Sequence, residues 1–145
     1  MTYKSLTLTT LLLLVLDQGT KKYIITQNFP HQQNPSLFFL NTPLPFLVAL
    51  SAIFLFILFI WLIKTAKQKN HSLTIALSLI FIGGLSNFYN RLISGYVIDW
   101  IFLPLFPFSV LNLADLYITT GLLLAFFPLK NQNKHRFQHS GKIKI

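Results

Sequence analysis

Long apolar runs separated by short polar stretches dominate the chain. A helix that crosses a bilayer needs about 20 apolar residues, because each residue adds about 1.5 Å across a hydrocarbon core about 30 Å thick. This pattern predicts four spans, at about residues 5–25, 44–63, 72–90 and 109–129. The first run is the weakest, since polar residues follow it closely. We expect it to be a retained helix, because no small-x-small cleavage site follows the run.

The composition agrees with a membrane protein. Hydrophobic residues make up 53% of the chain and charged residues 10%, whereas a soluble domain carries about a quarter charged residues. The fold class predicted is an all-α membrane protein whose residues 1–145 form a single domain. The absence of cysteine excludes a disulfide framework and a thiolate nucleophile.

The basic residues predict the orientation in the membrane. The net charge is +9, and in a chain with several spans we interpret this charge as flanking the membrane rather than binding nucleic acid. Nine basic residues fall on one predicted side: Lys4, Lys64, Lys67, Lys69, Lys130, Lys134, Arg136, Lys142 and Lys144. Only Lys21, Lys22 and Arg91 fall on the other. Both termini are therefore expected in the cytoplasm, with residues 130–145 forming a basic tail.

The three acidic residues all approach the opposite, outer face under this topology. They are Asp17, Asp99 and Asp115, and the chain has no glutamate. An ionisable group at membrane depth is costly and therefore suggests a functional site. Lys21 follows Asp17 at the spacing of a helical ion pair, so we favour a structural role for Asp17.

The other two acids have simpler explanations too. Asp99 lies near the predicted interface and could be a solvated loop acid. Asp115 could be a neutral, hydrogen-bonded residue, since Asn112 and Thr119 share its helix face. Against these explanations stands a stripe of Gly83, Asn87 and Arg91, spaced by four along one face of the third span. Together with the acids, this stripe predicts a polar pocket at the outer boundary of the bilayer.

The residue types in this pocket limit its chemistry. Serine catalysis needs a base, but no histidine lies within a predicted span and the chain has no G-x-S-x-G motif. Two histidines in the tail, His135 and His139, are better explained as part of a solvated basic segment than as a metal site. Two close carboxylates can instead share one proton, activate a water molecule and polarise a carbonyl.

Two stretches carry a family resemblance: GGLSNFYNRLISGYVIDWIF and FPFSVLNLADLYITTG. They closely resemble the lipoprotein signal peptidase family (signal peptidase II), whose patterns read G-G-x-x-G-N-x-x-D-R, V-x-D-F and F-N-x-A-D. The segment LDQGTKKYI is similar to the family's D-x-x-x-K motif. The resemblance implies that Asp99 and Asp115 are the catalytic dyad. It also implies supporting or substrate-binding positions, which are Asp17, Lys21, Asn41, Asn87, Arg91, Asn112 and Ala114.

The same resemblance implies the fold and the activity. The family has four transmembrane helices and a small extracytoplasmic β-cradle, for which residues 27–43 are the candidate here. It removes the signal peptide of diacylglyceryl-modified prolipoproteins, before the lipidated cysteine, at the outer face of the bacterial cytoplasmic (inner) membrane. The expected partners are this substrate and membrane lipid, with no cofactor, no metal and no nucleic acid, and the chain is expected to act as a monomer.

The chain departs from the family pattern at a few positions. Asn90 stands where the family has aspartate before the arginine, and Leu116 follows the alanine-aspartate pair where serine is common. Residues 41–46 read N-T-P-L-P-F rather than N-x-G-x-A-F. Two alternatives therefore stay open: a catalytically inactive relative, and a small proton-relay or transport protein.

Overall fold

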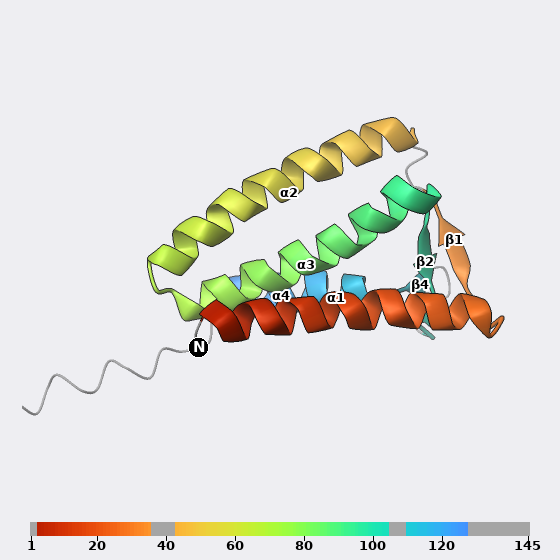
Figure 1. Ribbon diagram of the computed structural model, residues 1–145, viewed down its shortest axis with the longest axis horizontal. Helices are drawn as coiled ribbons and strands as arrows, with labels where there is room; N and C mark the ends of the chain where they lie inside the picture. The colour runs from red at the N-terminus through yellow and green to blue at the C-terminus, as the bar shows by residue number, and fades with distance from the viewer. Residues whose placement is uncertain (1–2, 36–42, 105–109, 128–145) are drawn as a thin grey trace, which may run out of the picture.

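The computed structural model describes residues 3–35, 43–104 and 110–127. These residues form four helices and four short strands: α1 (Tyr3–Thr26), β1 (Gln32–Asn34), α2 (Leu44–Lys67), α3 (His71–Ser94), β2 (Val97–Asp99), β3 (Ile101–Phe102), β4 (Val110–Leu111) and α4 (Leu113–Phe126). The strands gather at one end of the helices, while the α2–α3 turn and the beginning of α1 lie at the other (Figure 1).

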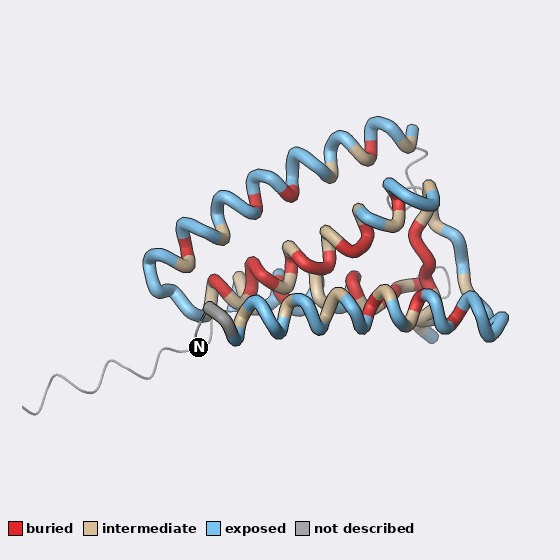
Figure 2. The backbone as a smooth tube through the Cα atoms, viewed as in Figure 1, coloured by how far each residue is buried: buried red, intermediate tan, exposed pale blue. Residues whose placement is uncertain are grey.

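Helix α3 is the centre of the bundle. It packs against α1, α2 and α4, and it carries much of the buried surface (Figure 2). Helix α2 instead exposes large apolar side chains along most of its length, including Phe54, Phe56 and Ile57. Such a surface suits contact with lipid rather than water.

Two helices, α2 and α3, are long and apolar enough to cross a membrane. Helix α4 is apolar but shorter. The mostly helical architecture predicted from the sequence is therefore present in the described residues. Four spans and cytoplasmic termini stay predictions, and the basic tail at 130–145 lies outside the described residues.

Glycines bring α3 and α4 into close contact. A Cβ atom on Gly83 would collide with the backbone carbonyl oxygen of Ala114 and the side chain of Ile118. A Cβ atom on Gly121 would collide with the backbone of Ala76 and the side chain of Ile80. Small residues let helix backbones approach closely, as expected for membrane bundles. This approach holds the first turn of α4 against the middle of α3.

The chain reverses sharply after α3. Gly95 ends the helix in the left-handed conformation, with φ of 81°, and its N–H bonds to the carbonyl of Arg91. A residue with a Cβ atom would be strained at this φ. The reversal brings β2, with Asp99 at its end, back over the end of the bundle.

Two short antiparallel sheets cover this end. In the first, β1 pairs with β2, and Gln32 and Asn34 lie opposite Asp99 and Val97 respectively. In the second, β3 pairs with β4. Strand β1 falls within the predicted cradle segment 27–43, but its partner strand at 97–99 was not expected. Residues 36–42 lie outside the described part.

Helix α4 begins later than the sequence pattern predicted. The predicted span starts at residue 109, whereas Val110 and Leu111 form a strand and the helix starts at Leu113. The cause is Asn112, which caps the helix by accepting a hydrogen bond from the N–H of Asp115. Hydropathy alone could not separate the apolar strand from the apolar helix that follows it.

Candidate active site

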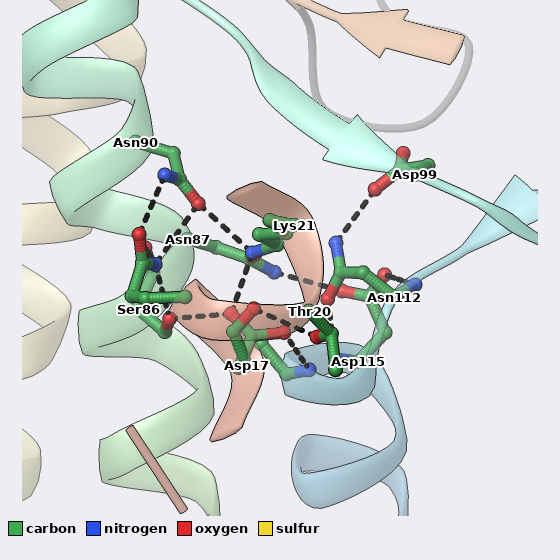
Figure 3. Close-up of polar contacts among 11 residues, drawn as sticks. Asp17, Thr20, Lys21, Ser86, Asn87, Asn90, Asp99, Asn112 and Asp115 are labelled. Carbon is green, nitrogen blue, oxygen red and sulfur yellow. Dashed lines mark hydrogen bonds and ion pairs between the residues drawn. The ribbon is translucent and has the colours of Figure 1, made fainter. Parts of the chain in front are cut away.

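The three aspartates lie near one another at the strand end of the bundle (Figure 3). Asp17 comes from α1, Asp99 from the end of β2 and Asp115 from the first turn of α4. Three parts of the chain that are far apart in sequence thus supply the acids. The stripe predicted on α3 contributes to a polar pocket beside Asp115, since Asn87 of that helix donates to Asp115 and both residues line the pocket together with Arg91.

Asp17 is buried, and both of its carboxylate oxygens have polar partners. Its Oδ2 atom lies 2.7 Å from the Nζ of Lys21 and accepts a hydrogen bond from the hydroxyl of Ser86 at 2.6 Å. Its Oδ1 atom accepts from the N–H of Ala114 at 2.9 Å. The side chain is completely shielded, with 0% exposure. The ion pair expected from the i, i+4 spacing is therefore present within α1. The hydrogen bonds of Asp17 to Ser86 and Ala114 also join α1 to α3 and α4.

Lys21 distributes its three protons over three partners. Besides the Asp17 carboxylate, its Nζ donates to the Oδ1 of Asn87 and to the Oδ1 of Asn90, each at 2.9 Å. An ammonium group has three donors and no acceptor, so this set is complete. Because the oxygen of Asn87 faces Lys21, its NH₂ group is free to point toward the Oδ1 of Asp115, to which it donates at 2.8 Å.

Asn112, at the N-terminal end of α4, also orients the carboxylate of Asp115. Its Oδ1 accepts from the N–H of Asp115 at 3.0 Å, and its own N–H donates to the Oδ2 of Asp115 at 3.1 Å. This reciprocal pair is a capping box. It leaves the NH₂ group of Asn112 to donate to the Oδ1 of Asp99 at 2.6 Å. One asparagine therefore ties together the two acids of the predicted dyad.

Asp99 is held from β1 as well. The NH₂ group of Asn34 donates to the Oδ2 of Asp99 at 3.1 Å. Burial raises the pKa of the Asp99 carboxyl above its ordinary value of 3.8, while the hydrogen bonds from Asn34 and Asn112 and the charges of Lys21 and Arg91 oppose that rise. The net direction is upward, so a proton on this acid is favoured relative to an exposed aspartate.

A cavity of about 380 Å³ opens beside these groups. Its polar lining is Asn87, Arg91 and Asp115, together with Ser51 and Thr119. The apolar lining comes from α2, α3 and α4 and from the residue before Asn112: Phe54, Leu55, Gly84, Leu111, Ile118 and Leu122. A mostly apolar wall with a few convergent polar groups is typical of a ligand site.

A second and larger cavity, of about 580 Å³, lies between α1 and α3. Its lining is apolar apart from Gln18, Lys22 and the hydroxyl of Tyr89, and none of the three aspartates reaches it. The candidate site is therefore chosen by its chemistry rather than by the size of the cavity.

Asp115, which lines the cavity, and Asp99, which is linked to it through Asn112, differ from Asp17 in the kind of partner they have. Each oxygen of Asp99 and Asp115 accepts a hydrogen bond from an uncharged amide. The two carboxylates also interact electrostatically with each other, and both are attracted by the positive charges of Lys21 and Arg91. Like charges at close range cannot both ionise easily, so such a pair can hold a single proton. That arrangement can activate water.

The structure brings most of the predicted site residues together. Asp17, Lys21, Asn87, Asn112 and both dyad acids form one hydrogen-bonded group. Arg91 lines the cavity beside them, and so does Thr119. Asn41 lies outside the described residues. Within residues 3–35, 43–104 and 110–127, no set of three or more histidine, cysteine or acidic side chains is placed to hold a metal ion.

Sequence reasoning missed Asn34, Gln18 and Ser86. Asn34 sits in a stretch rich in glutamine, asparagine and proline that reads as a loop, and only the pairing of β1 with β2 brings it to Asp99. Ser86 lies four residues before Asn90 on one face of α3, and that spacing was the available signal. Gln18 is adjacent to Asp17 in sequence and shares no helix face with it, so only the packing of α1 on α3 brings it to Ser86 and Asn90.

Comparison with known proteins shows the family of the chain. A model of the signal peptidase (SPase) II family, Peptidase_A8, matches residues 9–129. The lipoprotein signal peptidase of Staphylococcus haemolyticus is 31% identical over 135 residues, which cover 81% of this chain and 85% of that protein. The lipoprotein signal peptidase of Streptococcus pneumoniae is 29% identical over 134 residues, covering 82% and 88%.

Solved structures show the same architecture. A bacterial membrane enzyme determined by the in meso method at 2.3 Å resolution matches with a TM-score of 0.78 and 26% identity, covering 97% of this chain and 96% of that one. Another, at 1.9 Å, matches with a TM-score of 0.76 and 28% identity, covering 90% and 95%. The fold and its relatives define a membrane enzyme. The chain belongs to the signal peptidase II family, and this membership implies a peptidase.

Proposed function

We propose that the chain removes the signal peptide from diacylglyceryl-modified prolipoproteins by cleaving before the lipidated cysteine. Family membership supports the substrate class. The observation that carries the mechanism is the pair Asp99 and Asp115, which Asn112 joins and of which Asp115 lines the cavity. Both are desolvated, and in the described residues each of their oxygens accepts a hydrogen bond from an uncharged amide, whereas Asp17 is paired with the ammonium of Lys21.

In the proposed reaction the two acids share one proton. The ionised carboxylate takes a proton from a water molecule, whose oxygen attacks the carbonyl carbon of the scissile peptide. The protonated acid donates a hydrogen bond and then its proton to the carbonyl oxygen. When the C–N bond breaks, a proton passes to the leaving amine and the carbonyl re-forms. The dyad again holds one proton, and no covalent intermediate with the protein arises.

The hydrogen-bond donors around the acids favour a pair in which one carboxyl group is ionised and the other is protonated. Asn87 and Asn112 hold each carboxylate in one orientation, so little reorganisation is required when charge moves between the acids. Arg91 and Lys21 lie near enough to act electrostatically on both acids. Their positive charge keeps one of the two carboxylates ionised despite burial, which a general base requires.

The walls of the cavity suit the proposed substrate. Phe54 and Leu55 of α2 face Ile118 and Leu122 of α4 across it. These side chains are compatible with the apolar residues of a signal peptide and with acyl chains, because burial of apolar surface is favourable whatever its exact shape. Among the polar lining residues, Asn87 donates a hydrogen bond to Asp115, and the scissile peptide would lie beside this acid.

The test of this function is cleavage by the purified full-length chain in detergent or liposomes. A prolipoprotein peptide with a diacylglyceryl-modified cysteine should be cut before that cysteine. The matched control is the same peptide without the lipid, and it should be cut far more slowly. No cleavage of either peptide, together with flux of an ion down its gradient in liposomes, would favour the transport alternative instead.

We also propose that the chain acts as a monomeric single domain in the bacterial inner membrane, with the acids toward the outer face. The asymmetry of basic residues supports this orientation. Reporters fused after residue 145 or inserted within residues 64–71 should be cytoplasmic, and one within residues 27–35 should be extracytoplasmic. An extracytoplasmic reporter at residue 145 would contradict the orientation.

A further inference from the structure

A pair of side-chain amides lies behind the catalytic group, on the interface of α1 and α3. The Nδ2 of Asn90 donates to the Oε1 of Gln18 at 3.1 Å, and the Nε2 of Gln18 donates to the Oδ1 of Asn90 at 3.2 Å. The same Nε2 donates to the hydroxyl oxygen of Ser86 at 2.7 Å. The hydroxyl of Ser86 in turn donates to Asp17. Both amides are thus held in one orientation.

This orientation points the oxygen of Asn90 at Lys21. The Oδ1 of Asn90 accepts from the Nζ of Lys21 at 2.9 Å and supplies the third of the three acceptors that surround this ammonium group. Lys21 is 2% exposed, so water cannot easily replace a missing acceptor. The Nζ of Lys21 also directs the amide of Asn87, which donates to Asp115. A continuous chain of hydrogen bonds therefore joins Gln18 to Asp115.

The acceptor at position 90 is uncharged, and this affects the charge of the buried group. Its charged and titratable side chains are Asp17 and Lys21 from α1, Arg91 from α3, Asp99 from β2, and Asp115 and Tyr117 from α4. Strand β1 and the part of α2 that lines the cavity contribute only uncharged residues. With three carboxylates and two cations, the group is neutral when the dyad holds a single proton. Neutral groups are favoured where the dielectric constant is low.

We propose that Gln18 and Asn90 are positioning residues for the hydrolysis, holding Lys21 so that Asn87 is directed at Asp115 while adding no charge to the buried group. The inference rests on the proposed function. Neither residue lines the catalytic cavity, so both act on the rate of the chemical step rather than on the binding of substrate.

The decisive variants change position 90 in two ways. Asn90→Leu keeps the approximate volume but removes the acceptor, and kcat should fall about tenfold to a hundredfold, the range for one lost hydrogen bond to a charged group, with KM little changed. Asn90→Asp keeps the acceptor and should recover much of that loss. Gln18→Leu should fall between Asn90→Leu and the wild type. Tyr89→Leu, an exposed neighbour on the same helix, is the matched control and should behave as wild type.

The pH profile provides a readout that a purely structural role would not change. In Asn90→Asp a fourth carboxylate raises the proton affinity of both dyad acids, so both limbs of the bell-shaped profile should move to higher pH. An unshifted profile would overturn the charge argument. Should Asn90→Leu fail to fold, this shift together with the Gln18→Leu rate still decides the proposal.

Asp99→Asn belongs in the same assay, because its result distinguishes a failure of the positioning role from a failure of the proposed function. If Asp99→Asn is inactive while Asn90→Leu keeps the wild-type kcat and pH profile, the positioning role is wrong and the proposed function stands. If Asp99→Asn itself keeps near-wild-type activity, the two-acid mechanism fails, and the positioning role fails with it.

Discussion

Asp17 and the pair formed by Asp99 and Asp115 are the same kind of side chain at the same end of the bundle, yet their surroundings differ. Asp17 is 0% exposed and contacts the ammonium of Lys21 directly. In the described residues, each oxygen of Asp99 and Asp115 accepts a hydrogen bond from an uncharged amide. The two cations near them, Lys21 and Arg91, act at longer range.

Under the proposed function, this difference distinguishes a structural acid from two catalytic ones. A buried carboxylate with a directly bound cation holds the fold together, because removal of either partner would leave the other charge buried and unpaired. Carboxylates held by neutral donors and desolvated by the protein stay closer to balance between the two protonation states. A proton can then be exchanged with water and substrate. The same residue type therefore supports the fold in one place and is suited to catalysis in the other.

The largest effect is expected at the dyad. Asp99→Asn and Asp115→Asn should each give a folded protein that no longer cleaves, because asparagine keeps the shape but cannot exchange the shared proton. A general acid or base contributes about 10²–10⁴ in rate, and residues that act as a unit are non-additive. The double variant should therefore be hardly slower than either single one. Cleavage rates on the lipidated peptide measure this, and a single variant near the wild-type rate would remove the distinction between the acids.

Asp17→Asn should show the opposite division between stability and activity. Removing one partner of a buried ion pair typically costs about 3–5 kcal/mol, so the folded yield and the Tm in detergent should fall. Activity per folded molecule should fall much less. Lys22→Gln is the matched control, since it removes a charge from the exposed neighbour of Lys21. A well-folded Asp17→Asn protein without any cleavage would place Asp17 in the chemistry instead.

The smallest effect is expected at Asn34, which sharpens the contrast by removing a single neutral donor from Asp99. That hydrogen bond favours the ionised carboxylate, so Asn34→Leu should raise the pKa of Asp99 further above 3.8. The acid limb of the pH–rate profile is lost when the dyad gains a second proton, and it should therefore move to higher pH. The rate at the optimum should fall roughly two- to tenfold.

Gln33→Leu is the control for Asn34→Leu, because adjacent residues of a strand point to opposite faces. It should leave the profile unchanged. An Asn34→Leu profile that coincides with the wild type would mean that the sheet holds Asp99 in place without influencing its protonation.

The sequence by itself determined what depends on local spacing. Runs of about 20 apolar residues predicted where the helices lie, although α4 begins at Leu113 because its cap is a local side-chain effect that hydropathy does not register. The pair of Asp17 and Lys21 followed from the i, i+4 geometry of a helix. The resemblance to signal peptidase II is confirmed by the matched family. The roles that it implies for Asp99 and Asp115 stay predictions.

Only the tertiary structure decided which neutral groups surround the acids. Asn34 reaches Asp99 across 65 residues of sequence, and Asn90 reaches Lys21 across 69. Neither contact has a periodic signature, because each depends on how β1 pairs with β2 and how α1 packs on α3. The physical reason is that a hydrogen bond depends on atoms placed within about 3 Å of each other. Hydrophobic patterning selects the faces that pack, but the packing itself sets distances on that scale.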